Sequence, residues 1–223
     1  MAVRAVRGEH ALMGRSQCDG CGTALSFAQT VPVISYLAHG GSCSVCGGKI
    51  DPTHVIGELG GGAVGLCAMA AAPWPRMALL GALGLTLLGS ALIDARTRRL
   101  PDILTLLIAA CGAGLSVLKG QGVLLEGLVA AAVAFLLAEG VRRGFLWLNR
   151  SPGLGFGDVK LIAALALWLG AATPWMVVAA ALIGLVGFLF VRTADGRLPF
   201  GPSLALGAWI IGLAREAGLW PLA

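Results

Sequence analysis

Two aspartates have the residue type and the setting for acid–base chemistry at the edge of a membrane. Asp94 ends one apolar run, and Asp158 opens another in the segment Gly155-Phe156-Gly157-Asp158. Ionisable residues at membrane depth are costly, so by default they suggest function. If the two carboxyls lie at one depth, like-charge repulsion leaves one as a base and the other as an acid. The pair then predicts an aspartic peptidase, in which one Asp activates water and the other protonates or polarises the scissile carbonyl.

Each aspartate also has a structural interpretation that the sequence leaves open. Asp158 could cap the N-terminus of a helix, where the helix dipole favours an acid. Asp94 could form an ion pair with Arg96 or Arg98. Caps and surface ion pairs are common, so either aspartate alone is weak evidence, and the pair carries the prediction.

Four further residues are expected to support this site. Gly155 and Gly157 would let the backbone approach an extended substrate closely. Lys160 follows two residues after Asp158, just inside the same apolar run. Glu58 lies about one turn inside the first apolar run, where it could serve the site or bond to a neighbouring helix.

Four cysteines near the N-terminus have the spacing of a metal site. They form the pairs Cys18-x2-Cys21 and Cys43-x2-Cys46. Structural zinc closes its site with four sulfurs, and a domain of about forty residues is too small to be held by core burial alone. A disulfide pair and a redox C-x-x-C motif are the alternatives. The cytoplasmic location that the basic residues predict (see below) argues against a disulfide pair. The lack of a βαβ pattern argues against a redox motif. The sequence therefore predicts a structural zinc site.

The elements that position these residues are predicted to be membrane helices. The 223 residues are 57% apolar and 12% charged, and the mean hydropathy is +0.87, whereas an ordinary soluble domain has roughly 25% charged residues. Such hydropathy excludes disorder, and apolar runs that do not alternate exclude an outer-membrane barrel. We expect an all-α polytopic membrane protein with about seven transmembrane helices, because apolar runs near the necessary length of about 20 residues occur at residues 55–72, 77–93, 103–118, 122–141, 159–172, 175–191 and 203–219.

The basic residues predict which side of the membrane each loop faces. Thirteen of the 16 Lys and Arg residues fall on one side: Arg4, Arg7, Arg15, Lys49, Arg96, Arg98, Arg99, Arg142, Arg143, Arg150, Lys160, Arg192 and Arg197. The other side has Arg76, Lys119 and Arg215. The positive-inside rule places the larger set in the cytoplasm, which makes residues 1–54 a cytoplasmic four-cysteine domain and residues 55–223 the transmembrane domain. The net charge of +5 is then a sign of topology, and we expect no nucleic-acid partner.

Several short motifs occur in a fixed order along the chain, and together they resemble a known family. They are Arg15-Ser16-x-Cys18-x-x-Cys21, residues 31–36, Cys43-x-x-Cys46-Gly47, Ile56-Gly57-Glu58, Asp94-x5-Leu100-Pro101-Asp102, residues 155–161 with the pattern GxGD, and Pro199-Phe200-Gly201-Pro202. Over residues 8–210 the chain resembles the type IV prepilin peptidases, the bifunctional leader peptidases and N-methyltransferases of pilus and type II secretion systems.

The resemblance implies a substrate, a reaction and a location. Asp94 and Asp158 match the family's catalytic pair. The substrate would be a prepilin or pseudopilin whose basic leader ends in Gly, cleaved at the cytoplasmic face of the bacterial inner membrane. The new N-terminus would then be methylated with S-adenosylmethionine. No glycine-rich motif for that cofactor is present, so methylation is expected from the resemblance alone.

The chain also departs from the family in one respect. The family usually has eight spans, one of them before the cysteine domain, and this chain has seven apolar runs. Residues 1–9 resemble the end of that first span, so either the start site was placed late or the span is missing.

The alternatives to a peptidase are a membrane assembly scaffold and a small ion or metal transporter using Glu58, Asp94 and Asp158. Transporters often contain internal repeats and acids at mid-span, and the sequence shows neither pattern.

Overall fold

The chain divides into two compact units, Met1–Ala63 and Val64–Ala223. The computed structural model describes residues 17–18, 20–26, 32–149, 153–190 and 199–219. Within these ranges the chain is helical, and its β structure consists of two isolated bridges. The expected features at residues 1–9, 15–16 and 31, and the basic residues Arg150, Arg192 and Arg197, lie outside the described residues.

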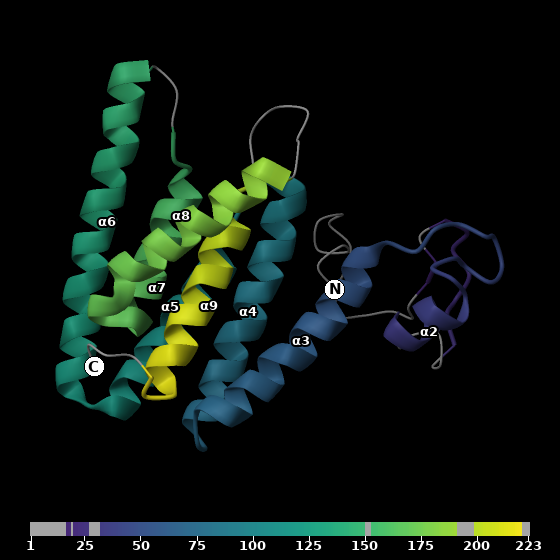
Figure 1. Ribbon diagram of the computed structural model, residues 1–223, viewed down its shortest axis with the longest axis horizontal. Coiled ribbons are helices and arrows are strands. Elements are labelled where there is room, and N and C mark those ends of the chain that lie inside the picture. Colours follow the sequence, from purple (N-terminus) through teal and green to yellow (C-terminus); the bar gives the residue numbers. More distant parts are fainter. Residues whose placement is uncertain (1–16, 19, 27–31, 150–152, 191–198, 220–223) are drawn as a thin grey trace. The chain divides into compact units, whose positions relative to one another are not determined.

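Seven long helices fall on the seven apolar runs expected from the sequence. The N-terminal unit contains the short helix α2 (Pro32–Ala38) and the first part of α3 (Pro52–Ala71). The second unit continues with α4 (Arg76–Thr97), α5 (Asp102–Lys119), α6 (Gln121–Asn149), α7 (Phe156–Leu169), the 3-10 turn η2 (Gly170–Ala172), α8 (Thr173–Phe190) and α9 (Gly201–Glu216), as Figure 1 shows. The expectation of an all-α protein is confirmed.

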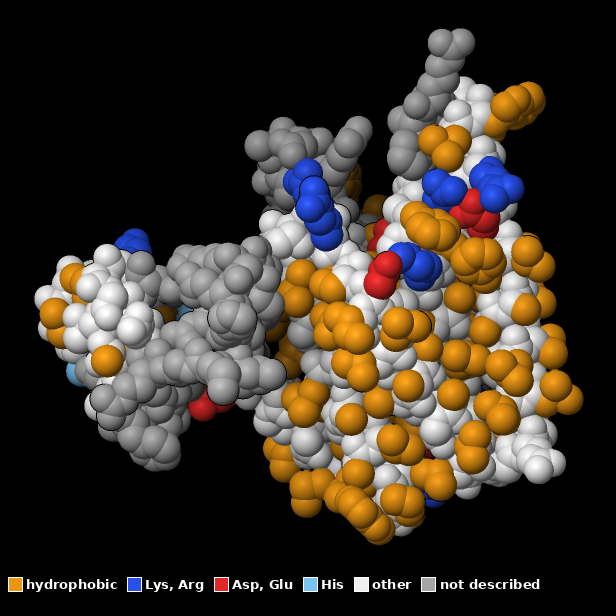
Figure 2. Space-filling model, turned by 180° about the vertical axis from the view of Figure 1, so that it is seen from behind, with side chains coloured by type: hydrophobic (Ala, Val, Ile, Leu, Met, Phe, Trp, Pro, Cys, Tyr) orange, Lys and Arg blue, Asp and Glu red, His pale blue; other side chains and the backbone are white. Residues whose placement is uncertain are grey.

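The helices have the length and surface of a multi-pass membrane protein. Five stretches are long and apolar enough to cross a bilayer, and the last of them, Phe156–Phe190, combines α7 and α8. On the face seen in Figure 2, apolar side chains cover most of the helical unit. Leu136 on α6 and Phe190 on α8 are among many large apolar side chains that are exposed. In water such a surface would be unfavourable, whereas lipid is as apolar as these side chains. The count of seven spans stays a prediction.

Helix α7 lies at the centre of the second unit. It packs against α5, α6 and α9, and α9 in turn packs against α4 and α8. Leu161, Leu165 and Leu169 on α7 are fully buried, and Trp168 on the same helix is 1% exposed. Because α7 is enclosed by other helices, its position is set by protein contacts on several sides, and it can hold a functional side chain at a fixed place.

Small residues allow some of these helices to approach each other closely. A Cβ atom added to Gly127 on α6 would lie 2.5 Å from the carbonyl oxygen of Leu167 on α7. One added to Gly207 on α9 would lie 2.9 Å from the backbone nitrogen of Ala180 on α8. Such contacts replace the hydrophobic driving force that lipid does not provide. Gly89, in contrast, has open space around it.

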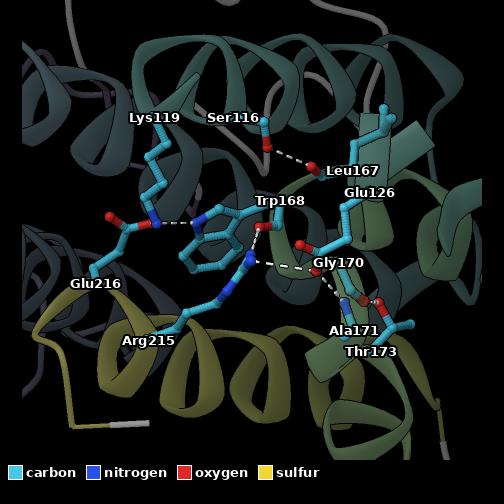
Figure 3. Close-up of polar contacts among 10 residues, drawn as sticks. All are labelled: Ser116, Lys119, Glu126, Leu167, Trp168, Gly170, Ala171, Thr173, Arg215 and Glu216. Carbon is cyan, nitrogen blue, oxygen red and sulfur yellow. Dashed lines mark hydrogen bonds and ion pairs between the residues drawn. The ribbon is translucent and has the colours of Figure 1, made fainter. Parts of the chain in front are cut away.

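A buried carboxyl group joins four helices at one end of the second unit. Glu216, at the end of α9, accepts hydrogen bonds from Lys119 Nζ at 2.7 Å and from Trp168 Nε1 at 2.9 Å (Figure 3). Arg76 Nη1 lies 3.7 Å from its other oxygen, and the Glu216 side chain has no exposed surface. Glu216 therefore ties α9 to α4, α5 and α7.

Its neighbour Arg215 makes a second set of contacts at the same end. Arg215 donates a hydrogen bond to the carbonyl oxygen of Trp168 at 2.7 Å, and its guanidinium lies 3.4 Å from Glu126 Oε1 on α6. Glu126 also accepts a hydrogen bond from the Ala171 N–H in η2 at 2.7 Å (Figure 3). The three basic residues that the sequence placed on the far side thus lie together, each paired with a glutamate.

We expect Glu216→Ala to destabilise the helical unit. Removing the carboxylate leaves Lys119 as a partly buried, unpaired charge, and breaking a buried ion pair in this way typically costs about 3–5 kcal/mol. Thermal unfolding of the purified protein in detergent measures the effect. Glu126→Ala is the control, because its carboxyl is 42% exposed and its loss should lower the midpoint less. Equal midpoints for wild type and Glu216→Ala would contradict the assignment.

Candidate active site and four-cysteine cluster

Asp94 lies buried near the end of α4, with 5% of its surface exposed. Its Oδ2 accepts a hydrogen bond at 3.0 Å from the backbone N–H of Gly201, the first residue of α9. The first N–H groups of a helix have no partner inside the helix, and the dipole there favours a negative charge. The start of α9 therefore provides Asp94 with a donor that α9 itself does not use.

Asp158 is held in a similar way by its own helix. Gly155 is the N-cap of α7, and Asp158 is the third residue of that helix. The carboxyl of Asp158 accepts a hydrogen bond from the Gly155 backbone N–H. An acid at this position that reaches back to the N-cap is the second half of a capping box. Asp158 is thus not itself the N-cap, although it supports the same helix end.

The two carboxyls that the sequence paired lie close enough to interact electrostatically. The charge of Asp94 acts on Asp158, although they lie 64 positions apart along the chain. They come from α4 and α7, and both stand at helix ends on the side of the unit opposite Glu216. Arg76, which starts α4, is near Glu216, and Asp94 follows it by 18 residues, or about 27 Å of helix. Repulsion between two carboxylates within electrostatic reach favours a state in which one of them keeps its proton.

The glycines beside Asp158 fill a tight space. A Cβ atom on Gly155 would lie 3.0 Å from Asp158 Oδ2, and one on Gly157 would lie 3.3 Å from the Cβ of Leu100. These contacts give each glycine a packing role at the site. Whether they also admit a substrate backbone, as the sequence suggested, stays a prediction.

Charged side chains surround the first turn of α7. Lys160 forms an ion pair with Asp102, the first residue of α5, and its Nζ lies 5.1 Å from the centre of the Phe156 ring. The guanidinium of Arg142 on α6 lies 5.2 Å from the same ring. Such cation–ring contacts stabilise modestly when exposed. Lys160 therefore links α5 and α7 beside the aspartates.

A second ion-pair group lies on α6 at the same end of the unit. Glu139 accepts hydrogen bonds from Arg142 and Arg143, each at 2.7 Å. Most charged side chains visible on the helical unit in Figure 2 gather at this end. The carboxyl pair thus stands at the same end of the unit as this charged surface, rather than in its apolar middle.

Glu58 has its contact within the N-terminal unit. Its Oε2 accepts a hydrogen bond from the Val33 N–H at 2.7 Å, near the start of α2. The unpaired N–H groups at a helix start make this a favourable place for a carboxylate. The geometry gives Glu58 a role in holding α2, and its expected role in supporting the aspartates stays a prediction.

The four cysteines form two turns with the same hydrogen-bond pattern. Cys18 N–H bonds to the Thr23 carbonyl at 2.9 Å, and Cys43 N–H bonds to the Gly48 carbonyl at 2.8 Å. In each turn the N–H four residues after the first cysteine, at Gly22 or Gly47, returns to the carbonyl of that cysteine at 2.9 Å. An antiparallel bridge closes each turn, Gln17 to Ala24 and Ser42 to Lys49. Gly22 and Gly47 have φ values of 70° and 68°, which glycine adopts at no steric cost.

The two turns bring all four sulfur atoms together. The sulfurs lie within 4.8 Å of one another, and Cys18 Sγ is 3.8 Å from Cys46 Sγ. Hydrogen bonds to the side chain and backbone of Thr23 lower the pKa of Cys21 to about 6. At Cys46 a backbone hydrogen bond from Gly48 lowers the pKa, but the nearby thiols of Cys21 and Cys43 outweigh it, and the pKa rises to about 11. Metals bind thiolates, so a cation would relieve this crowding, and the cluster is suited to hold a metal ion.

Gly201 is the residue at this site that sequence reasoning missed. The motif Pro199-Phe200-Gly201-Pro202 was recognised, and a Gly-Pro pair before an apolar run indicates a helix start with free N–H groups. Nothing in the sequence says that this helix start meets Asp94, which lies 107 positions earlier.

The different thiol acidities predict different rates of alkylation in chelator-treated, metal-free protein. Because its pKa is about 6, Cys21 is mostly thiolate at pH 7 and should react with iodoacetamide well before Cys46, whose pKa is about 11. The rate at Cys21 should rise with pH around pH 6. Thr23→Val removes the side-chain hydrogen bond and should slow Cys21 at pH 7. Peptide mass spectrometry measures each site, and equal rates at Cys21 and Cys46 would contradict this prediction.

Comparison with known proteins identifies the family to which these features belong. Residues 79–190 match the Type IV leader peptidase family, and residues 1–72 match the Bacterial Peptidase A24 N-terminal domain. The chain is similar to the prepilin leader peptidase/N-methyltransferase of Burkholderia pseudomallei (strain 1026b), with 38% identity over 202 residues, covering 86% of this chain and 65% of that protein. The protein of the same name from Neisseria gonorrhoeae is 37% identical over 212 residues, which are 91% of this chain and 72% of that protein.

A third relative supports the same conclusion. The prepilin leader peptidase/N-methyltransferase of Aeromonas hydrophila is 31% identical over 207 residues, covering 89% of this chain and 71% of that protein. The chain spans about two thirds (65%) of the length of the Burkholderia relatives that it matches. No solved structure matches. The matched region of residues 79–190 contains both aspartates, and the chain belongs to the type IV leader peptidase family.

Proposed function

We propose that this protein is a membrane aspartic endopeptidase that removes the leader from type IV prepilins or pseudopilins. The observation that carries the proposal is that the carboxyls of Asp94 and Asp158 lie within electrostatic reach of each other at one end of the unit, each held by a glycine N–H at a helix start. The relatives named as prepilin leader peptidases supply the substrate class. The expected leader is basic and ends in Gly.

Asp94 and Asp158 are the proposed catalytic residues. One carboxylate takes a proton from a water molecule, whose oxygen attacks the carbonyl carbon of the last Gly of the leader. The other carboxyl gives its proton to the carbonyl oxygen. When the tetrahedral intermediate collapses, the C–N bond breaks, the leaving nitrogen takes a proton from one carboxyl, and a hydroxyl group of the intermediate returns a proton to the other. The products are the leader with a carboxylic acid and the mature protein with an amine, so the carboxyl pair ends with the one proton it began with.

The surroundings suit a substrate that is partly embedded in lipid. The apolar stretch of a prepilin can lie against the exposed apolar side chains of the helices, and its leader can extend into the polar region near Lys160 and Asp102. Lys160, Gly155 and Gly157 support the pair by fixing the start of α7. The expected supporting role of Glu58 rests on the sequence, since its contact in the structure is with the Val33 N–H.

The proposed location is the bacterial inner membrane, with the carboxyl pair at the cytoplasmic face. Arg96, Arg98 and Arg99 follow Asp94, and Arg142 and Arg143 lie at the same end of the unit, so the positive-inside rule supports this orientation. Residues 1–54 would then form a cytoplasmic domain, and residues 55–223 the peptidase domain.

We propose that the four-cysteine cluster holds a structural zinc ion. For Zn–S bonds of about 2.3 Å, the sulfurs of a tetrahedron are about 3.8 Å apart, which is the spacing of Cys18 and Cys46. Cys18, Cys21, Cys43 and Cys46 would be the ligands. Four sulfurs close the coordination shell, so the ion would supply folding energy and no open position for chemistry.

The second proposed activity is methylation of the new N-terminus with S-adenosylmethionine. It is supported by the relatives' names, which include N-methyltransferase. No contact among the described residues points to a binding place for that cofactor, and we assign no residues to the transfer. The scaffold and transporter alternatives are not favoured, because the relatives are named as enzymes and the acids pair at one end of the unit.

Replacing either aspartate should abolish cleavage. We expect Asp94→Asn and Asp158→Asn to reduce leader removal by at least ~10³-fold, because catalytic groups that act as a unit are lost together. The assay co-expresses the chain with a prepilin from its host and follows the substrate by gel shift and mass spectrometry, which also detects an added methyl group.

Glu126→Gln is the matched control for these variants. Glu126 is an acid at the opposite end of the unit and its side chain is 42% exposed, so its replacement should change the rate by less than about fivefold. Full processing by Asp94→Asn or by Asp158→Asn, with normal membrane insertion, would rule out the proposed pair.

The zinc proposal predicts about one zinc ion per purified chain, measured by inductively coupled plasma mass spectrometry. Cys46→Ser removes one ligand and should lose most of the metal and expose the N-terminal unit to proteolysis. Cys67→Ser, an isolated cysteine in α3, should keep both the metal and the protection. Metal content unchanged in Cys46→Ser would show that the cluster is not the site.

A further inference from the structure

The two proposed catalytic carboxyls receive the same kind of support. Asp158 is bonded by the N–H of Gly155 at the start of α7, and Asp94 by the N–H of Gly201 at the start of α9. We propose that Gly201 is a positioning residue for Asp94: its N–H holds the carboxyl, and its lack of a side chain leaves the space that the carboxyl occupies. This inference rests on the proposed function, because it concerns one of the two proposed catalytic groups.

The space at Gly201 is occupied by one side chain. A Cβ atom there would lie 2.5 Å from Asp94 Oδ2, 2.9 Å from its Cγ and 3.1 Å from its Cβ. Real Cβ atoms essentially never approach other atoms this closely, so any residue except glycine must displace something. Both Asp94 and Gly201 are buried, which leaves little open space into which the carboxyl could swing.

Helix α9 is held too firmly to give way instead. At its far end Glu216 and Arg215 bind side chains or backbone of α5, α6 and α7 (Figure 3). Glu216 also lies 3.7 Å from Arg76 of α4. Along its length Gly207 lies against the backbone of α8, and Gly212 lies against the ring of Trp168. Sliding α9 away from Asp94 would break these contacts. The Asp94 carboxyl is therefore the group that moves when Gly201 is enlarged.

Such a displacement should affect the chemical step more than substrate binding. A misplacement of about 1 Å at a catalytic group can cost about 10²-fold in rate. The proposed substrate contacts along the exposed apolar helices do not involve Gly201, so KM should change little. Gly201→Ala should therefore lower kcat by about 10- to 100-fold and change KM by less than about twofold.

The first experiment compares Gly201→Ala with Gly89→Ala in prepilin cleavage. Gly89 lies in α4, the helix that carries Asp94, and an added Cβ there meets nothing within 4 Å. Both variants add one methyl group to a glycine within a helix, but only Gly201→Ala presses on Asp94. Gly89→Ala should keep both kcat and KM near the wild-type values.

The second experiment is a double-mutant cycle on thermal unfolding in detergent, which needs no catalytic activity. Gly201→Ala should lower the midpoint in the wild-type background. In the Asp94→Ala background the carboxyl group is absent, so the same substitution should cost little. A variant that fails to fold in the first background is then still informative if it folds in the second.

The outcomes separate this inference from the proposed function. If Gly201→Ala cleaves the prepilin with the wild-type kcat, the positioning role of Gly201 is overturned and the proposed peptidase activity stands. If the wild-type protein does not cleave its prepilin, the proposed function is overturned. The unfolding cycle then still shows whether Gly201 contacts Asp94. Equal midpoint losses in the two backgrounds overturn the contact between Gly201 and Asp94, whereas a loss that vanishes with Asp94→Ala supports it.

Discussion

Two acidic side chains, Asp94 and Asp158, lie within electrostatic reach of each other, and the helix ends that meet around them must make this arrangement possible. Like charges within electrostatic reach are unfavourable, most of all where little water is present. Two helix starts, those of α7 and α9, point backbone N–H groups at the pair and offset part of this cost. The ends of α4, α7 and α9 must meet for this to happen.

Lipid changes how the rest of the unit can supply the necessary rigidity. Because lipid tails are as apolar as leucine, burial alone does not drive these helices together. The close approaches at Gly127 and Gly207 provide packing. The buried Glu216 forms polar contacts that determine which helix ends meet. The same helix, α9, carries Gly201 at one end and Glu216 at the other, so the far polar network also sets where α9 stands beside Asp94.

The sequence predicted most of the fold and the residue types of the site. Seven apolar runs correspond to α3–α9, and the paired cysteines do come together, because both features depend on local spacing. It did not predict Gly201 against Asp94, or Glu216 between Lys119 and Trp168. Both contacts join residues about 50 to over 100 positions apart, and apolar periodicity does not encode which helix ends meet.

The sequence also leaves open which helix position Asp158 occupies at the start of α7. An acid at the start of a helix could be the N-cap or a residue of the first turn, and only the backbone geometry shows that Gly155 takes the cap position. Two carboxyls in one chain likewise give no distance. Their meeting depends on how α4 and α7 pack through α5 and α9, which is a property of the assembled helices.

The two cysteine turns have a consequence for how the N-terminal unit can vary. Each turn is complete by itself, with its own hydrogen bonds and bridge, so a bound ion would join two preformed halves. The chain between them, residues 22–42, would then be a closed loop. Because the entropy cost of closing a loop grows only with the logarithm of its length, insertions in this stretch would weaken the centre very little. The spacing within each turn is strict, and the spacing between the turns is free to drift.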